Sequence, residues 1–298
     1  MKRSDITEDN LVATYSIVAC DPETGELGIA VQSKFLAVGA VVPWAKANVG
    51  AIATQSWANT SFGPRGLQLL EEGYEPEKVV EMLLENDEGR ELRQFAVMDA
   101  KGRVAAFTGK ECFDWAGHQY GQNCSAQGNI LVSEATVQAL VETFESAEGT
   151  LAERLLAALD TGENAGGDSR GRQSAALYVV KENGGYGGYN DRQFDLRVDD
   201  HPEPIEELKR LYDLHMLYFS KTDASALVDI EGQIIVEVEE ALQKLGFLET
   251  TDSPVALKEA LKTFHLQENF DDKYREDNKI DIAVLRFMRG KAAKKVSV

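Results

Sequence analysis

Short apolar segments alternate with turn residues over the first two hundred positions. Thr14–Cys20 and Leu27–Ser33 are rich in apolar and β-branched residues, and a segment with a proline and a glycine separates them. This pattern predicts a β-hairpin. Val49–Ser56 predicts a third strand, and Arg93–Gly109 predicts a second hairpin around an Asp-to-Gly turn.

Helical patterns occur in pairs between these strands. Two runs of leucine and valine at helical spacing lie within 64–84, and two more lie at Ser133–Phe144 and Thr150–Leu159. Thr150 followed by Glu153 is a capping-box signature for the last of these helices. Strands are predicted again at 173–181 and 192–198. Hairpins with paired helices favour two antiparallel sheets with helices outside over a doubly wound parallel sheet.

The pattern changes at residues 199–205, where two prolines mark a boundary. Helical periodicity then dominates at 205–218, 230–245, 255–264 and 282–289. We therefore predict an N-terminal extension over 1–13, an α+β domain over 14–200, a small all-helical domain over 201–290 and a basic tail over 291–298.

Composition narrows the function classes. The 298 residues are 43% hydrophobic and 27% charged, as in globular proteins, and the formal net charge is −19. Such an acidic chain is repelled by phosphate backbones and anionic lipid, so neither nucleic acid nor a membrane is expected as the main partner. The N-terminus lacks the apolar region of a secretory signal, which predicts a cytoplasmic protein. The three cysteines and four histidines lack metal-site spacing, so no metal or other cofactor is expected.

A glycine-rich loop before the strand at 173–181 concentrates polar side chains. It contains a G-x-S-x-G pattern at 167–171, but a helix precedes it and a strand follows, the reverse of a hydrolase nucleophile elbow. One interpretation is a helix-to-strand connection that uses glycine for positive φ. The other is a site loop, because five polar residues fall within seven positions: Asp168, Arg170, Arg172, Gln173 and Ser174.

Polar residues also follow the apolar strands, where sites are often built. These residues are Ser33, Lys34, Gln55, Ser56 and Asn59. Lys46 lies in an apolar stretch and would have a lowered pKa if buried, although a lysine with an exposed ammonium is the commoner case. His118 is the histidine of the sheet region, and a structural role is open beside a catalytic one.

The first domain resembles a known family. The segment TYSIVACDPETGELGIAVQSKFLAVGAVVPWAKANVGAIATQS and the motifs DWAGH, QGNIL and GGDSRGRQSAAL are similar to DUF1028, an uncharacterised family placed in the N-terminal-nucleophile (Ntn) hydrolase superfamily. The resemblance covers Thr14 to Val198. The segment from His201 to Arg289 resembles the peptidoglycan-binding domain often attached to this family. Together they imply a four-layer αββα sandwich followed by a helical domain.

The resemblance also implies a mechanism and a site. Ntn hydrolases attack an amide carbonyl with a Thr, Ser or Cys that opens the first strand, and the free α-amine of that residue acts as base. Thr14 is the corresponding nucleophile, with Lys46 or Lys34 as the nearby lysine and Asn59 as an oxyanion donor. Asp168 and Ser174 would orient the amine or substrate. The expected substrate-binding residues are Ser33, Lys34, Gln55, Ser56, Arg170, Arg172, Gln173 and His118.

Thirteen residues precede Thr14, and an acylated nitrogen cannot act as a base. The first hypothesis is therefore a hydrolase of small amide or peptide-like substrates that requires cleavage between Ala13 and Thr14. The second is a catalytically inactive binding protein of the same fold, with peptidoglycan fragments as its ligand. A homo-oligomer is compatible with either, while a metal-dependent enzyme is poorly supported by the scattered histidines.

Overall fold

The structure is a computed structural model that describes residues 14–249 and 253–295. The predicted extension, residues 1–13, lies outside the described residues. The chain divides into two compact units, Met1–Leu211 and Tyr212–Val298. This division falls about ten residues after the predicted boundary, because one helix, α5 (Pro204–Phe219), runs through it.

Six antiparallel strands form the larger sheet of the first unit. Their order is β10 (Arg192–Val198), β9 (Ser174–Val180), β2 (Glu26–Ser33), β1 (Thr14–Asp21), β8 (Cys124–Asn129) and β7 (Gly117–Gly121). The predicted first hairpin is present as β1 and β2, with Thr14 opposite Ser33 and Asp21 opposite Glu26. β1 and β2 lie inside the sheet, which explains their nearly continuous burial.

A second antiparallel sheet has the order β3 (Pro43–Lys46), β4 (Gly50–Ser56), β5 (Arg93–Asp99) and β6 (Val104–Thr108). The third predicted strand and the second predicted hairpin are both found here. The short edge strand β3 was not predicted from the sequence.

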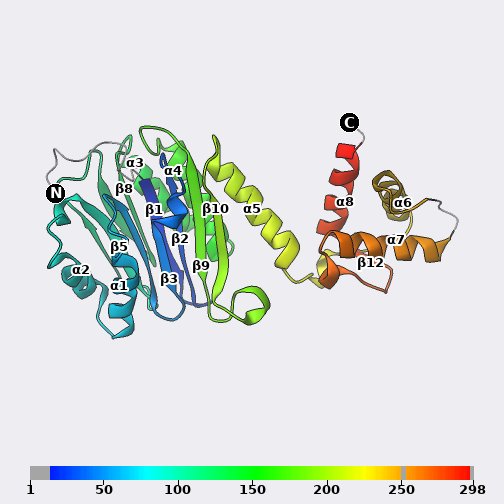
Figure 1. The fold of residues 1–298 in the computed structure, drawn as a ribbon, viewed down its shortest axis with the longest axis horizontal. Helices are drawn as coiled ribbons and strands as arrows, with labels where there is room; N and C mark the ends of the chain where they lie inside the picture. Colours follow the sequence, from blue (N-terminus) through cyan, green and yellow to red (C-terminus); the bar gives the residue numbers. More distant parts are fainter. Residues whose placement is uncertain (1–13, 250–252, 296–298) are drawn as a thin grey trace. The chain divides into compact units, whose positions relative to one another are not determined.

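Each sheet has a pair of helices on one face (Figure 1). Helices α1 (Phe62–Glu71) and α2 (Pro76–Leu84) pack on the four-stranded sheet through a cluster that includes Phe62, Leu83 and Phe95. Helices α3 (Ala135–Ser146) and α4 (Leu151–Asn164) pack on the six-stranded sheet. The predicted capping box is confirmed, because the Thr150 side chain accepts from the Glu153 backbone N–H and Glu153 bonds back.

The other faces of the two sheets meet in a shared core. Alternate residues of β1 and β2, such as Val18 and Ile29, pack there against Ala53 and Met98 of the second sheet. Burying a side chain of this size stabilises the fold by about 1.5–3 kcal/mol. At one end of the same strands the inward residues become polar, among them Thr14, Ser16 and Gln55. This polar end is the candidate site.

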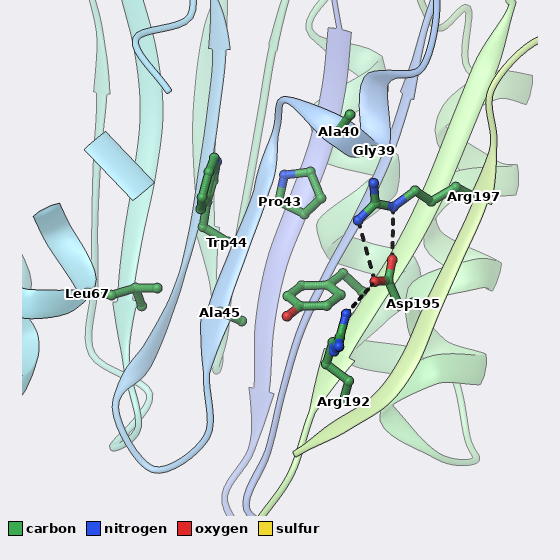
Figure 2. A pocket seen from close by; sticks show the side chains of 10 residues that line it. Gly39, Ala40, Pro43, Trp44, Ala45, Leu67, Arg192, Asp195 and Arg197 are labelled. Carbon is green, nitrogen blue, oxygen red and sulfur yellow. Dashed lines mark hydrogen bonds and ion pairs between the residues drawn. The ribbon is translucent and has the colours of Figure 1, made fainter. Parts of the chain in front are cut away.

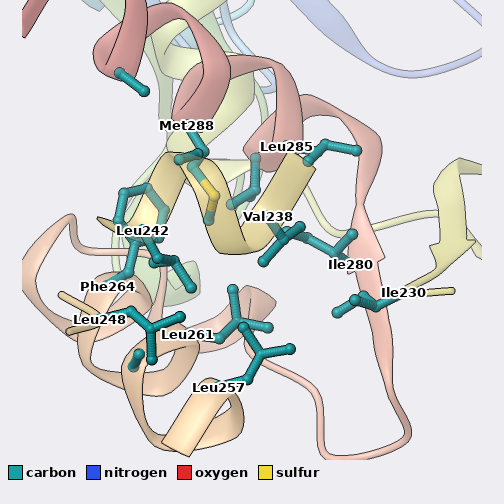
Figure 3. Close-up of a cluster of buried hydrophobic side chains, with 14 of the residues drawn as sticks. Ile230, Val238, Leu242, Leu248, Leu257, Leu261, Phe264, Ile280, Leu285 and Met288 are labelled. Carbon is teal, nitrogen blue, oxygen red and sulfur yellow. The ribbon is translucent and has the colours of Figure 1, made fainter. Parts of the chain in front are cut away.

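The second unit is mainly helical and has its own core. Its elements are the end of α5, β11 (Leu227–Asp229), α6 (Gln233–Leu245), α7 (Pro254–Gln267), β12 (Lys279–Asp281) and α8 (Ile282–Lys295). Figure 3 shows Leu242, Leu261 and Met288 packed together in that core. The prediction of an all-helical domain missed a small ladder between β11 and β12, whose strands have only three residues each. The predicted basic tail is helical to Lys295, and its last three residues lie outside the described part.

Candidate functional site

Four polar residues stand side by side across one end of the six-stranded sheet. Ser174 of β9 pairs with Ser33 of β2, Ser33 pairs with Thr14 of β1, and Thr14 pairs with Asn129 of β8. Residues directly opposite in antiparallel strands point to the same face. All four are buried. We call this set the Thr14 row.

Thr14 has defined partners on both sheets, one through its side chain and one through its backbone. Its hydroxyl Oγ1 donates to Ser33 Oγ at 3.1 Å. Its backbone carbonyl accepts from Gln55 Nε2 of the second sheet at 3.3 Å. Thr14 is therefore held at the start of β1 by one neighbour along the row and one across the space between the sheets.

Glutamines connect the row to the second sheet. Gln94 Oε1 accepts from Gln55 Nε2 and from Asn129 Nδ2, each at 2.9 Å. Gln127 Nε2 donates to Ser16 Oγ at 2.6 Å, and Ser16 Oγ lies 2.6 Å from Gln55 Oε1. The sequence analysis proposed Gln55 but missed Gln94, Gln127 and Asn129. A signal existed for Gln94, which is a polar residue in the otherwise apolar run of β5, whereas β8 is polar at every second residue from Ser125 to Asn129.

The predicted glycine-rich loop reaches the same end of the sheet. Asp168 is buried, and its Oδ2 accepts from the backbone N–H of Lys34 at 2.9 Å. Its Oδ1 accepts from the backbone N–H of Arg170 at 3.0 Å, and the Arg170 guanidinium completes an ion pair at 3.2 Å. Asp168 thus fixes the residue that follows Ser33, so it positions the row without touching Thr14 through any of these bonds.

Two residues beside the row have strained backbones. Ile130, which follows Asn129, has φ of 53°, and Ser56, which follows Gln55, has φ of 64°. A β-branched residue rarely adopts positive φ, and such strain collects at functional sites. Both residues lie directly next to groups that contact the row or belong to it.

His118 joins the outer edge of this network. Its Nδ1 lies 2.9 Å from Thr108 Oγ1, which also accepts from Gln94 Nε2 at 3.1 Å. Burial lowers the pKa of His118 below its usual value. We therefore expect a neutral imidazole that accepts the threonine proton at Nδ1.

Two other proposed residues, Lys46 and Asn59, make their hydrogen bonds away from the row. Lys46 pairs with Gly50, at the opposite end of β4 from Gln55, which is about 17 Å away at the usual strand rise. Its ammonium is half exposed and bonds to Glu71 at 2.6 Å. Asn59 Oδ1 accepts from Ser61, at the start of α1, at 2.7 Å.

The remaining candidates are Ser174, at the end of the row, and residues at its rim. Ser174 Oγ donates to the carbonyl of Phe35 and accepts from the Val38 N–H, so it anchors the chain after β2. The Gln173 N–H donates to the Ser33 carbonyl at 3.0 Å, and its side chain bonds to Asp200. Arg172 pairs with Glu203 at 2.7 Å, and the Lys34 side chain is exposed.

Neither a metal site nor a membrane span is evident in residues 14–249 and 253–295. No group of three or more His, Cys, Asp or Glu side chains there could hold a metal ion. No helix among the described elements has the length and apolar character needed to cross a bilayer. The cysteines of this part, Cys20, Cys112 and Cys124, are buried free thiols.

Comparison with known proteins places this α/β unit in a family. Residues 14–208 match a family model described as "Family of unknown function (DUF1028)", so the chain belongs to that family. A crystal structure of a DUF1028 protein from Silicibacter pomeroyi is similar, with 37% identity and a TM-score of 0.63. The match covers 68% of this chain and 89% of that one. Residues 218–288 match a model described as "Putative peptidoglycan binding domain". No curated protein matches.

Proposed function

We propose that the first unit is an Ntn-type four-layer αββα sandwich that hydrolyses amide bonds with Thr14 as nucleophile. The observation that carries this proposal is the Thr14 row. A threonine hydroxyl opens the central strand β1, bonds to Ser33, and lies at the polar end of an otherwise apolar space between two sheets. Each sheet carries a helix pair on its other face, which supports the sandwich assignment.

The chemistry requires a free amine at Thr14. Attack of Thr14 Oγ1 on the Ala13 carbonyl would transfer the acyl group from nitrogen to oxygen, and water would then hydrolyse the ester. The products are a carboxylate on Ala13 and an α-amine on Thr14. That amine has an ordinary pKa near 7.7–8.0, so at neutral pH it can take the hydroxyl proton during attack on a substrate amide.

The row and its supports have distinct roles in this proposal. Ser33 Oγ accepts a hydrogen bond from the Thr14 hydroxyl in the resting state and thereby orients that hydroxyl. Gln55 holds the Thr14 carbonyl, and Asp168 holds the backbone after Ser33. Lys46 is excluded from these roles by its position at the other end of β4 and its bond to Glu71. The α-amine therefore acts as the base without lysine assistance from Lys46.

Intact mass and N-terminal sequencing of the purified chain test the proposal. We expect a chain that begins at Thr14. Thr14→Ala removes the hydroxyl and should leave the 13 preceding residues attached, while the matched variant Thr14→Ser keeps a hydroxyl and should still be processed. A wild-type chain that keeps its full N-terminus would contradict the mechanism.

Substrate screening is the second step. The processed chain should hydrolyse a member of a panel of small amides and peptidyl anilides, and Thr14→Ala should abolish that turnover. Equal turnover by wild type and Thr14→Ala on an established substrate would reject Thr14 as the nucleophile.

A second candidate function rests on the match of residues 218–288. We propose that this unit binds a peptidoglycan-related ligand, so that the whole chain is a binding protein if Thr14 stays acylated. Sedimentation of the full chain with purified peptidoglycan, with cellulose as the control polymer, tests this. Retention on peptidoglycan alone supports the proposal, and no retention on either polymer contradicts it.

A further inference from the structure

A cavity of about 200 Å³ lies in the first unit away from the Thr14 row. It is bounded by the edge strands of both sheets, β3 on one side and β10 on the other, and by β9 and the 3₁₀ turn at Val38–Ala40 (Figure 2). The volume is below the about 300–1,000 Å³ of pockets for drug-sized molecules. The cavity therefore suits a small ligand.

Two arginines and one aspartate from β10 line one wall of this cavity. Arg197 Nε donates to Asp195 Oδ1 at 2.9 Å, and Arg192 Nη1 lies 3.5 Å from Asp195 Oδ2. One carboxylate thus holds two guanidinium groups, which leaves a net local charge of +1 in a chain of net charge −19. A guanidinium has five N–H donors. Asp195 therefore orients both guanidinium groups and leaves some of their N–H groups available to a ligand.

Two aromatic residues, Trp44 of β3 and Tyr178 of β9, also line the cavity. The Trp44 indole N–H donates to the Val41 carbonyl at 3.0 Å, which fixes the ring. The same ring packs on Gly63 of α1, where an added Cβ would approach it to 2.2 Å. The Trp44 ring is therefore held in place before any ligand arrives, which lowers the entropic cost of binding.

We propose that this cavity binds a small organic anion in which a carboxylate or phosphate is attached to a flat ring. The guanidinium groups match the planar donor geometry that carboxylate and phosphate require. The ring would contact Trp44, Tyr178 and Pro43, which offer apolar and aromatic surface. The alternative is that the inward charges of β10 only protect an open sheet edge from pairing. Edge protection requires neither the aromatic residues nor a cavity.

The cavity is distinct from the Thr14 row. The 3₁₀ turn at Val38–Ala40 lies between them, because Gly39 and Ala40 line the cavity while the Val38 N–H bonds to Ser174 of the row. Binding at the cavity is therefore measurable whether or not Thr14 is processed. Failure of the hydrolase proposal and failure of this one are distinguishable.

The test is a titration of the full chain with phenyl phosphate, phenylacetate and the neutral compound 2-phenylethanol, followed by NMR of the three tryptophan indole N–H signals. Trp44→Phe assigns the signal of the cavity. We expect at least one of the two anions to shift the Trp44 signal, and we expect 2-phenylethanol to leave it unchanged. Binding of phenyl phosphate alone would identify the ligand as a phosphate ester, and binding of phenylacetate alone would identify it as a carboxylate.

Variants locate the anion. Arg197→Gln and Arg192→Gln should each weaken binding about tenfold, as for loss of one charge-assisted bond. The matched control is Arg103→Gln, since Arg103 has the same 42% side-chain exposure as Arg197 and also pairs with an aspartate, but does not line the cavity. Arg192 is 62% exposed, so its variant keeps the test valid if Arg197→Gln fails to fold. No shift at about 10 mM anion, or equal binding by the arginine variants, would overturn the proposal.

Discussion

Gln94 is one of the side chains, with Gln55, that join the two sheets at the candidate site. Its Oε1 accepts from Gln55 and Asn129, and its Nε2 lies within bonding distance of Thr108 Oγ1, the Gly117 carbonyl and the Gly128 carbonyl. Gln94→Met keeps the length of the side chain and removes every one of these bonds. It is therefore a perturbation of the network with little change in volume.

The loss of stability in Gln94→Met depends on which hydrogen bonds the partners of Gln94 retain. Gln55 Nε2 retains acceptors on Thr14 and Gln127, and the Thr108 hydroxyl retains His118. The Gly128 carbonyl loses its 2.7 Å bond and Asn129 Nδ2 loses its 2.9 Å acceptor. Each buried polar group that loses its partner costs about 1–3 kcal/mol. We expect Gln94→Met to lower the free energy of unfolding of the first unit by about 2–4 kcal/mol.

Tryptophan fluorescence during urea unfolding measures this unit alone. The chain has three tryptophans, Trp44, Trp57 and Trp115, and all of them lie within residues 1–211. The signal therefore separates the first unit from the second, which a whole-chain probe would mix. The control is Gln68→Met, an exposed helical glutamine bonded to Glu72, with an expected change below about 0.5 kcal/mol. A Gln94→Met change as small as that of the control would refute the network argument.

The second unit and the cavity give three further expectations. Asp281→Asn breaks a buried pair with Lys273 at 3.0 Å and should destabilise the second unit by about 3–5 kcal/mol in urea unfolding followed by circular dichroism. Burial raises the pKa of Asp281, but bonds from Thr222 and Lys273 outweigh it and lower that pKa overall, so this stabilisation should be lost below about pH 4. Burial lowers the pKa of His265, so the stability of this unit should fall as the pH drops below about 6.5, and His265→Leu should reduce that slope. Gly63→Ala should displace the Trp44 ring, seen as a shift of its fluorescence emission.

The strands and helices of the first unit were largely predictable because their signals are local. β1, β2 and β9 are continuous apolar runs bounded by turn residues, and the start of α4 has a complete capping box. β3 was missed because it has four residues, lies at a sheet edge and contains a proline. The β11–β12 ladder was missed for the same reason of length, since three residues show no periodicity.

Site residues depend on register, which the sequence does not specify. Ser33 and Gln55 were predicted because polar residues at strand ends share an edge of the sheet, whereas Asp168 and Ser174 were predicted from the polar glycine-rich loop and the family resemblance. Lys46 was proposed from its place in an apolar stretch, but it ends β3, which is antiparallel to β4, so it lies opposite Gly50 at the start of β4. Its charge could not be assigned to the correct end of the sheet without knowing that pairing.

The polar end of the sandwich is itself an argument for a site. β1 carries Val18 in the aliphatic part of the shared core and Ser16 two positions away at the polar end. In the same way, β4 carries Ala53 in the aliphatic part and Gln55 two positions away. Aliphatic residues at those positions would remove the need for a connected hydrogen-bond network, in which any missing partner costs about 1–3 kcal/mol. The chain instead keeps the network at the end where Thr14 begins β1 and where Ser56 and Ile130, which follow Gln55 and Asn129, have positive φ. Stability alone does not require that arrangement, whereas the nucleophile role proposed for Thr14 would require fixed polar neighbours around its hydroxyl.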